Sequence, residues 1–270
     1  ALRENSTSPR LAIPMQLQRA TSLLLNLGHA LDHMFLLIFA TAVASVADDF
    51  GFAHWEDLMP YSAGAFLMFG LGSVPAGRLG DLWGRRSMML VFFFGMGASA
   101  LLCALVQNAW QMAVALSVLG LFSAIYHPVG IPMLLQHAHK PGLTIGINGL
   151  AGNMGIAFAA ILTGFMVKYL GWRAAFVFPG LLSLACGWLF WRMAPPETES
   201  PARRTTRARI GLDKAQMARM FMVMTFAAIT SSLLFNFTTN GNGQLLRERL
   251  IGAVEDPAQL GVMLSAVYAM

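Results

Sequence analysis

The chain has 270 residues, of which 56% are hydrophobic and only 11% are charged, and its mean hydropathy is +0.59. A soluble domain carries about 25% charged residues, so this chain cannot cover a surface that faces water. Composition therefore excludes a soluble enzyme and intrinsic disorder, and it predicts an all-α integral membrane protein. The formal net charge is +5, with the basic residues in short clusters between apolar runs. That pattern orients membrane helices rather than binding nucleic acid.

Apolar runs in chain order predict about seven complete transmembrane helices and part of an eighth, since one span needs roughly 20 apolar residues. A polar tail over residues 1–18 precedes the first span and lacks the cleavage site of a signal peptide. The expected spans cover residues 21–46, 58–74, 88–106, 110–135, 143–167, 174–193 and 218–237, and the eighth begins near Pro257. Because the chain starts at Ala1 and stops at Met270 within an apolar run, we expect it to be a fragment of a longer protein.

A basic linker over residues 194–214 divides the chain into a six-helix bundle, residues 19–193, and the start of a second bundle, residues 215–270. With the amino terminus in the cytoplasm, 14 of the 18 basic residues fall inside and four fall outside, as the positive-inside rule requires. Those inside are Arg3, Arg10, Arg19, Arg78, Arg85, Arg86, Lys140, Arg192, Arg203, Arg204, Arg207, Arg209, Lys214 and Arg219; those outside are Lys168, Arg173, Arg247 and Arg249. We expect the linker to face anionic lipid, and an acidic group at Asp48, Asp49, Glu56 and Asp57 to lie outside with no base nearby.

Asp32 is the one acid in the middle of an apolar run. His29, Asp32 and His33 are spaced i, i+3 and i+4, so they share one helix face, which Asn26 extends by a turn. Ionisable groups inside spans are costly and mark proton or substrate pathways. A carboxylate between two imidazoles can exchange a proton, which predicts proton coupling at these three residues. The alternative is a packing pair that ties the first helix to a neighbour.

The fourth expected span holds Tyr126, His127 and Pro128. Proline frees a backbone carbonyl and kinks the helix, so Tyr126 and His127 are candidate substrate contacts, or alternatively only a solvated kink. Asn26 and, in the seventh span, Asn236 are the other candidate substrate ligands. In the glycine-rich fifth span we expect Asn148 and Asn153 to bond between helices that approach closely, or alternatively to line a cavity.

Cys103 and Cys186 both lie inside apolar runs, so neither a disulfide framework nor a metal-ligand spacing is present. No nucleophile–base set is found either. The sequence therefore predicts no enzyme activity, no cofactor and no metal site.

A glycine-rich loop with charged residues is expected between the second and third spans. Its notable residues are Gly77, Asp81, Gly84, Arg85 and Arg86. Glycines permit a tight turn, and the two arginines can pair with Asp81 or with lipid phosphate. Taken alone, such a loop is only an orientation signal.

These five residues resemble the signature loop of the major facilitator superfamily, Gly-x-x-x-Asp-x-x-Gly-Arg-Arg/Lys, at the place where that family has it. The turn at Gly171, Trp172 and Arg173 and the six-plus-linker layout are also similar to the family. A weaker resemblance, in His29 with Asp32-His33 and in Tyr126-His127-Pro128, is to the fosmidomycin-resistance branch of bacterial efflux proteins, although Val129 replaces its acid. Leu116 stands where many proton-coupled members carry an arginine, a departure that bears on proton antiport.

The resemblance implies twelve helices in two bundles, a substrate site between them near the midplane, and transport by alternating access. The loop residues would then latch the inner gate. We expect a secondary transporter that exports a small organic solute and couples this export to protons. We expect it to be a monomer surrounded by lipid in the bacterial inner membrane, and we expect it not to bind nucleic acid. The alternatives are an uptake symporter for an organic anion and, from another class, a membrane protein that binds a partner without transport.

Overall fold

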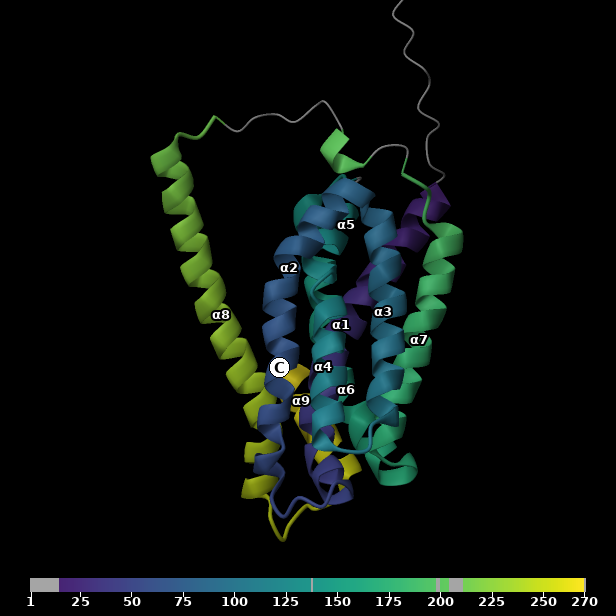
Figure 1. The fold of residues 1–270 in the computed structure, drawn as a ribbon, viewed down its shortest axis with the longest axis vertical. Helices are drawn as coiled ribbons and strands as arrows, with labels where there is room; N and C mark the ends of the chain where they lie inside the picture. Colours follow the sequence, from purple (N-terminus) through teal and green to yellow (C-terminus); the bar gives the residue numbers. More distant parts are fainter. Residues whose placement is uncertain (1–14, 137, 198–199, 204–210, 270) are drawn as a thin grey trace, which may run out of the picture.

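The structure is a computed structural model of the chain, shown in Figure 1, and it describes residues 15–136, 138–197, 200–203 and 211–269, apart from the side chains of Ala228, Asn236 and Asn240. Most of the expected cytoplasmic tail and the linker arginines Arg204, Arg207 and Arg209 lie outside the described residues. Every regular element in the described part is helical. The elements are α1 (Met15–Asp49), η1 (Trp55–Asp57), η2 (Met59–Ser62), α2 (Ala63–Trp83), α3 (Arg85–Leu105), α4 (Ala109–Ser123), η3 (Tyr126–Gly130), α5 (Ile131–Leu135), α6 (Pro141–Leu170), α7 (Trp172–Met193), η4 (Pro201–Arg203), α8 (Lys214–Arg249) and α9 (Pro257–Ala269).

Six of the described helices are long and apolar enough to cross a membrane: α1, α3, the run from α4 to α5, α6, α7 and α8. Helix α2 runs beside α4 over the length of the bundle (Figure 1), but glycines, Pro75, Arg78 and Asp81 lower its apolarity. The number of described helices that are long and apolar enough to span a membrane is therefore one fewer than the seven complete spans expected. The expected fold class, an all-α membrane bundle, is confirmed.

Two of the expected spans have wrong boundaries. The sequence predicts the second span over residues 58–74, but residues 59–62 form a short 3₁₀ turn and α2 continues to Trp83. The seventh was expected to end at residue 237, but α8 continues to Arg249 through a polar segment that contains Gly241 and Gly243. In both places glycine and polar residues continue a helix that neighbouring helices support.

The body of the bundle is built from helix pairs: α1 packs on α6, α3 on α7 and α2 on α4. Helix α9 packs on α6, and α8 approaches α1 through its carboxyl-terminal half, where Nε2 of Gln244 donates a 2.8 Å hydrogen bond to the carbonyl of Ala40. The other half of α8 leans away from the body (Figure 1), and its described side chains are exposed. The chain after the linker thus contacts the body through the carboxyl-terminal half of α8 and through α9.

Glycines set how closely α1 and α6 approach. A Cβ on Gly155 would meet the backbone carbonyl of Ala30, and a Cβ on Gly152 would lie 2.7 Å from Cε1 of His29. Without side chains at these two positions, the backbones come close enough for interhelical hydrogen bonds. The close packing expected for the glycine-rich fifth span is therefore present.

Candidate functional site

A buried carboxylate lies in the middle of α1. Asp32 is completely buried, and the hydroxyl of Ser123, the last residue of α4, donates a hydrogen bond to its Oδ1. Nε2 of His127, in η3, lies 3.6 Å from Oδ2, which has no hydrogen-bond partner among the described residues. The carboxylate thus connects α1 to the break in the span that runs from α4 to α5.

That break is a π-helical turn, Tyr126–Gly130. Pro128 lacks a backbone N–H and cannot continue the ordinary α-helical pattern, and π turns of this kind occur frequently at functional sites. The wider turn directs Tyr126 and His127 toward α1, where the ring of Tyr126 stacks on that of His29 with centroids 4.8 Å apart and the ring of His127 lies 5.1 Å from it.

A hydrogen-bond network fixes His29, which is 5% exposed. Its Nδ1 lies 2.7 Å from the backbone carbonyl of Asn148 in α6. The side-chain amide of Asn148 donates to Oδ1 of Asn26 at 2.9 Å and to the hydroxyl of Tyr126 at 2.8 Å. That hydroxyl in turn donates to the carbonyl of Leu25 at 2.8 Å. The network links α1, η3 and α6, so the expected bonding between helices is confirmed for Asn148, whereas Asn153 is exposed.

The remaining face of the cluster is open. The side chain of His127 is 40% exposed, and the half-buried ring of His33 lies 4.6 Å from that of His29. The ring of Phe235 in α8 lies 5.6 Å from that of His33. The cluster therefore faces the boundary between the bundle body and α8.

The structure brings together six of the residues singled out from the sequence: Asn26, His29, Asp32, His33, Tyr126 and His127. Asn236 follows Phe235 in α8, and its side chain is outside the described part. Sequence reasoning missed Ser123. It stands four residues before His127 and hence on the same helix face, so that spacing could have found it.

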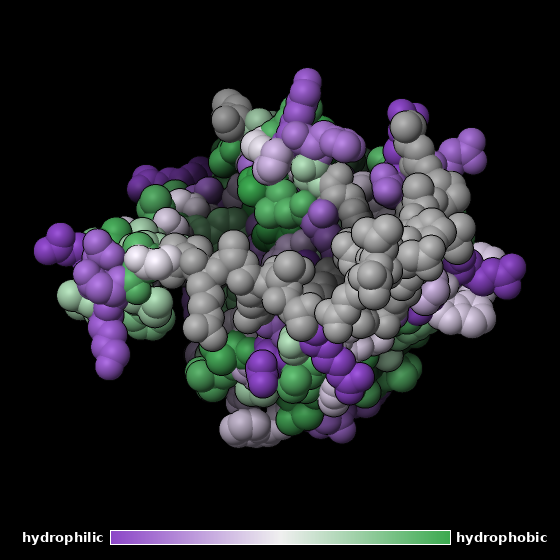
Figure 2. All heavy atoms as spheres, turned by 90° about the horizontal axis from the view of Figure 1, so that it is seen from above, coloured by the Kyte–Doolittle hydropathy of each residue, from purple (hydrophilic) through white to green (hydrophobic). Residues whose placement is uncertain are grey.

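The signature-loop residues lie where α2 ends and α3 begins, away from this cluster. Gly77 and Asp81 continue α2 rather than forming a turn, and only Gly84 breaks the helix, at φ 98°, a conformation that L-residues disfavour. Arg85 donates to the carbonyl of Pro132 at 2.9 Å. Arg86 donates to the carbonyls of Ala194 at 2.8 Å and Trp191 at 2.7 Å. Carbonyls at the carboxyl end of a helix lack intrahelical partners. The two arginines bond to such carbonyls and so tie α3 to the ends of neighbouring helices. Figure 2 views this end of the molecule, where hydrophilic side chains surround the rim.

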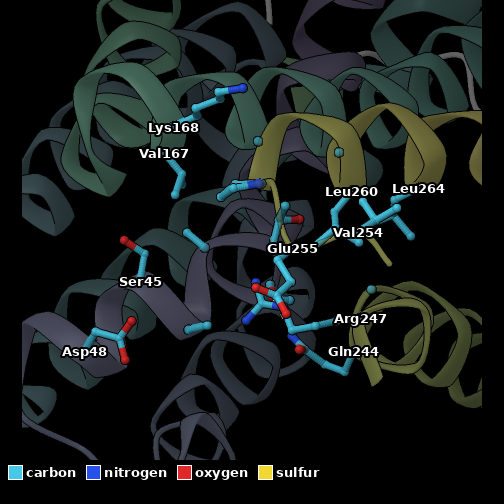
Figure 3. A pocket seen from close by; sticks show the side chains of 18 of the residues that line it. Ser45, Asp48, Val167, Lys168, Gln244, Arg247, Val254, Glu255, Leu260 and Leu264 are labelled. Atoms are coloured by element: carbon cyan, nitrogen blue, oxygen red, sulfur yellow. Dashed lines mark hydrogen bonds between the residues drawn. The ribbon is translucent and has the colours of Figure 1, made fainter. Parts of the chain in front are cut away.

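The opposite end holds a cavity of about 620 Å³ between α1, α6, α8 and α9. Figure 3 shows Asp48, Lys168 and Arg247 among the side chains that line it. Lys168 also forms an ion pair with Asp256, and the hydrogen bond from Lys168 holds the pKa of Asp256 below its usual range.

The expectation that no base lies near the acidic group is wrong, because Nη1 of Arg173 lies 2.8 Å from Oδ2 of Asp49. Only the fold brings that residue, from the start of α7, to the end of α1.

Comparison with known proteins decides the family, since the model of the Major Facilitator Superfamily matches residues 25–268. The chain belongs to the Major Facilitator Superfamily. This confirms the resemblance drawn from the signature loop, and it makes the chain a multi-pass integral membrane protein of a transporter family, not an enzyme.

Curated relatives in the superfamily include efflux pump terJ of Aspergillus terreus, 26% identical over 72% of this chain and 37% of that protein. The gallate transporter of Pseudomonas putida is 24% identical over 62% of this chain and 38% of that protein. The chain therefore spans little more than a third of the length of either relative.

Solved structures with the same fold include a bacterial homologue of the human lysosomal transporter Spinster, in an inward-facing and occupied conformation, with a TM-score of 0.70 at 14% identity over 92% of this chain and 57% of that one. The D-xylose–proton symporter matches with a TM-score of 0.62 at 15% identity, over 93% of this chain and 66% of that one. At these identities the likeness concerns the fold alone.

Proposed function

We propose that the protein is a secondary active transporter that moves a small organic solute out of the cell by alternating access, coupled to protons. The observation that carries the proposal is the fully buried Asp32, held by Ser123 beside three imidazoles at the boundary between the bundle body and α8. In an apolar span such a carboxylate is costly, and in transporters such groups form proton relays. Membership of a superfamily that includes efflux pump terJ and a proton symporter supports both the export and the proton coupling of this proposal.

In this proposal Asp32 carries the proton, and His29 and His33 exchange it with the open face of the cluster. His127 contacts the substrate, because its side chain is 40% exposed. Tyr126 is enclosed in this conformation, so it contacts substrate only when the helices move; until then it holds His29 in place. Asn26 and Asn236 complete the proposed substrate ligands.

We further propose that the end bearing the signature loop faces the cytoplasm and that the membrane is the bacterial inner membrane. The excess of basic residues in the tail, the signature loop and the linker supports this orientation. The residue ranges 1–18, 19–193, 194–214 and 215–270 then correspond to tail, first bundle, linker and the start of a second bundle, in a monomer surrounded by lipid.

The signature loop is proposed to latch the inner gate, and Asp81→Ala tests this. Because Asp81 lies in the last turn of α2, one turn before Arg85, its loss should loosen the α2–α3 junction without touching the substrate site. We expect turnover to fall about tenfold with substrate affinity unchanged within about twofold, as for a residue that governs a conformational step. Initial rates and equilibrium binding with the same substrate measure the two effects. A large loss of affinity would contradict the gate role.

Transport itself is tested with the intact protein in everted membrane vesicles. Lactate energises the vesicles, a quenched acridine dye reports internal pH, and a panel of organic solutes is added. Dequenching by one compound, absent from vesicles without the protein, is the expected result. No response from any compound, with the protein shown to be folded, would refute proton-coupled export.

Uptake of an organic anion is the second candidate, favoured by the similarity to the gallate transporter. The direction of the solute gradient that an imposed pH gradient builds in proteoliposomes separates the two. A membrane protein that only binds a partner would build no gradient of either sign.

A further inference from the structure

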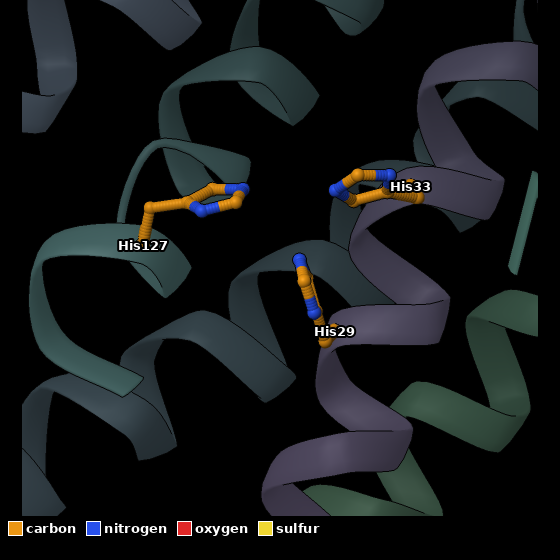
Figure 4. Close-up of side chains that lie close together, drawn as sticks. All are labelled: His29, His33 and His127. Carbon is orange, nitrogen blue, oxygen red and sulfur yellow. The ribbon is translucent and has the colours of Figure 1, made fainter. Parts of the chain in front are cut away.

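Three imidazoles from two separate elements converge on one point. His29 and His33 come from α1 and His127 from η3, and one ring nitrogen from each lies within 4.8 Å of the others. Figure 4 shows the three rings turned toward one another. Since His127 reaches the pair only through the fold, the spacing of histidines in the sequence gives no sign of this group.

The hydrogen bond of His29 sets which of its nitrogens is available. The backbone carbonyl of Asn148 can only accept, so Nδ1, 2.7 Å away, carries the hydrogen. Nε2 is then unprotonated in the neutral ring, and it is buried with no hydrogen-bond partner among the described residues. A histidine that donates one ring N–H to a backbone carbonyl and presents the other nitrogen has the arrangement of a metal ligand.

His127 and His33 supply the other two nitrogens of the group. Nε2 of His127 is 3.6 Å from Oδ2 of Asp32, a carboxylate oxygen that lacks a donor. At 3.6 Å this contact is not a hydrogen bond, so it leaves both nitrogens of His127 available, and the nitrogen that faces the other two rings can bind a metal. Nδ1 of His33 is also buried and has no hydrogen-bond partner in the described part of the chain.

We infer that His29, His33 and His127 form a binding site for one divalent transition-metal ion of the zinc class, with the Asn148 carbonyl orienting the ring of His29. Imidazole ligands favour zinc, copper or nickel over magnesium and calcium, which require oxygen. Metal–nitrogen bonds of about 2.0–2.1 Å place tetrahedral ligand atoms about 3.4 Å apart, so the rings close inward by about 1 Å on binding. The exposed side of His127 leaves a route of entry and a fourth position for water.

The test measures metal binding by the intact protein in detergent, purified with an affinity tag that contains no histidine. Co²⁺ replaces Zn²⁺ as the probe because its visible absorption reports tetrahedral nitrogen ligation. We expect one ion per chain, displaced by Zn²⁺. His33→Ala and His127→Ala should each weaken binding at least about 100-fold, more than the loss of a group that only orients a ligand. Gly152→Ala should weaken it as well, because the added Cβ displaces the ring of His29.

Matched controls separate ligation from a general effect of losing histidine. His54→Ala and His139→Ala remove exposed histidines outside the cluster, and both should leave Co²⁺ binding unchanged. His33→Cys should keep the ion and add a thiolate-to-Co²⁺ charge-transfer band, which arises only when residue 33 is itself a ligand. Absence of binding by the unaltered protein, binding unaffected by the cluster substitutions, or no new band in the cysteine variant would each overturn the inference. None of these readouts requires transport, so failure here is distinct from failure of the proposed function.

Discussion

Asp32→Asn is expected to reduce proton-coupled transport by the intact protein to background while the protein still inserts and folds. Asparagine has the shape of aspartate and keeps an oxygen that accepts the hydrogen bond from Ser123, so the contact between α1 and α4 is preserved. It does not titrate, and so no proton can be carried at this position. Dye dequenching in everted vesicles measures the coupled flux, and size-exclusion elution of the purified variant measures the fold.

Two further variants sharpen this result. Asp57→Asn removes an exposed acid in η1 and should leave transport unchanged. Ser123→Ala removes the donor to Asp32 while keeping the acid, and it should retain coupling with an altered pH dependence, because the carboxylate loses a partner that stabilises its charged form. Normal pH-dependent transport by Asp32→Asn would exclude the proton role and leave Asp32 as a packing partner between helices.

Gly155→Ala is expected to lower the thermal stability of the protein markedly. The new Cβ would meet the backbone carbonyl of Ala30, and two backbones cannot yield as a flexible side chain can. Overpacking of this kind costs about 1–3 kcal/mol, and separating α1 from α6 also weakens the hydrogen bonds that Asn148 makes to Asn26 and Tyr126. A thiol-reactive fluorescent dye can follow unfolding on heating, because Cys103 and Cys186 are both buried in the fold.

The matched control is Gly149→Ala on the same helix, where a Cβ would meet nothing within 4 Å. Alanine favours a helix interior over glycine by about 0.5–1 kcal/mol, so this variant should be unchanged or slightly more stable. Equal midpoint temperatures for the two variants would show that α1 and α6 do not touch as closely as the structure has them.

Local chemistry made much of the candidate site predictable. The i, i+3, i+4 spacing of His29, Asp32 and His33 requires one helix face, and an acid within an apolar run required a buried partner. The proline in the fourth span identified the helix break that carries Tyr126 and His127. Span boundaries were less predictable, because a glycine or a single charge near a helix end does not stop a helix that its neighbours support. Helix α2 therefore continues through Asp81, and only the positive φ of Gly84 ends it.

The sequence by itself determined that the chain is a bundle of membrane helices, that basic residues gather at one end, and that α1 carries a single ionisable stripe. Composition and helical periodicity suffice for these properties, since both are read within one segment. Only the tertiary structure decided that Ser123 and Asn148 meet that stripe and that His127 completes a group of three imidazoles. Apolar side chains pack as well against lipid as against another helix. The apolar pattern of a span therefore cannot fix its rotation or its neighbour, which are set by close glycine contacts and interhelical hydrogen bonds.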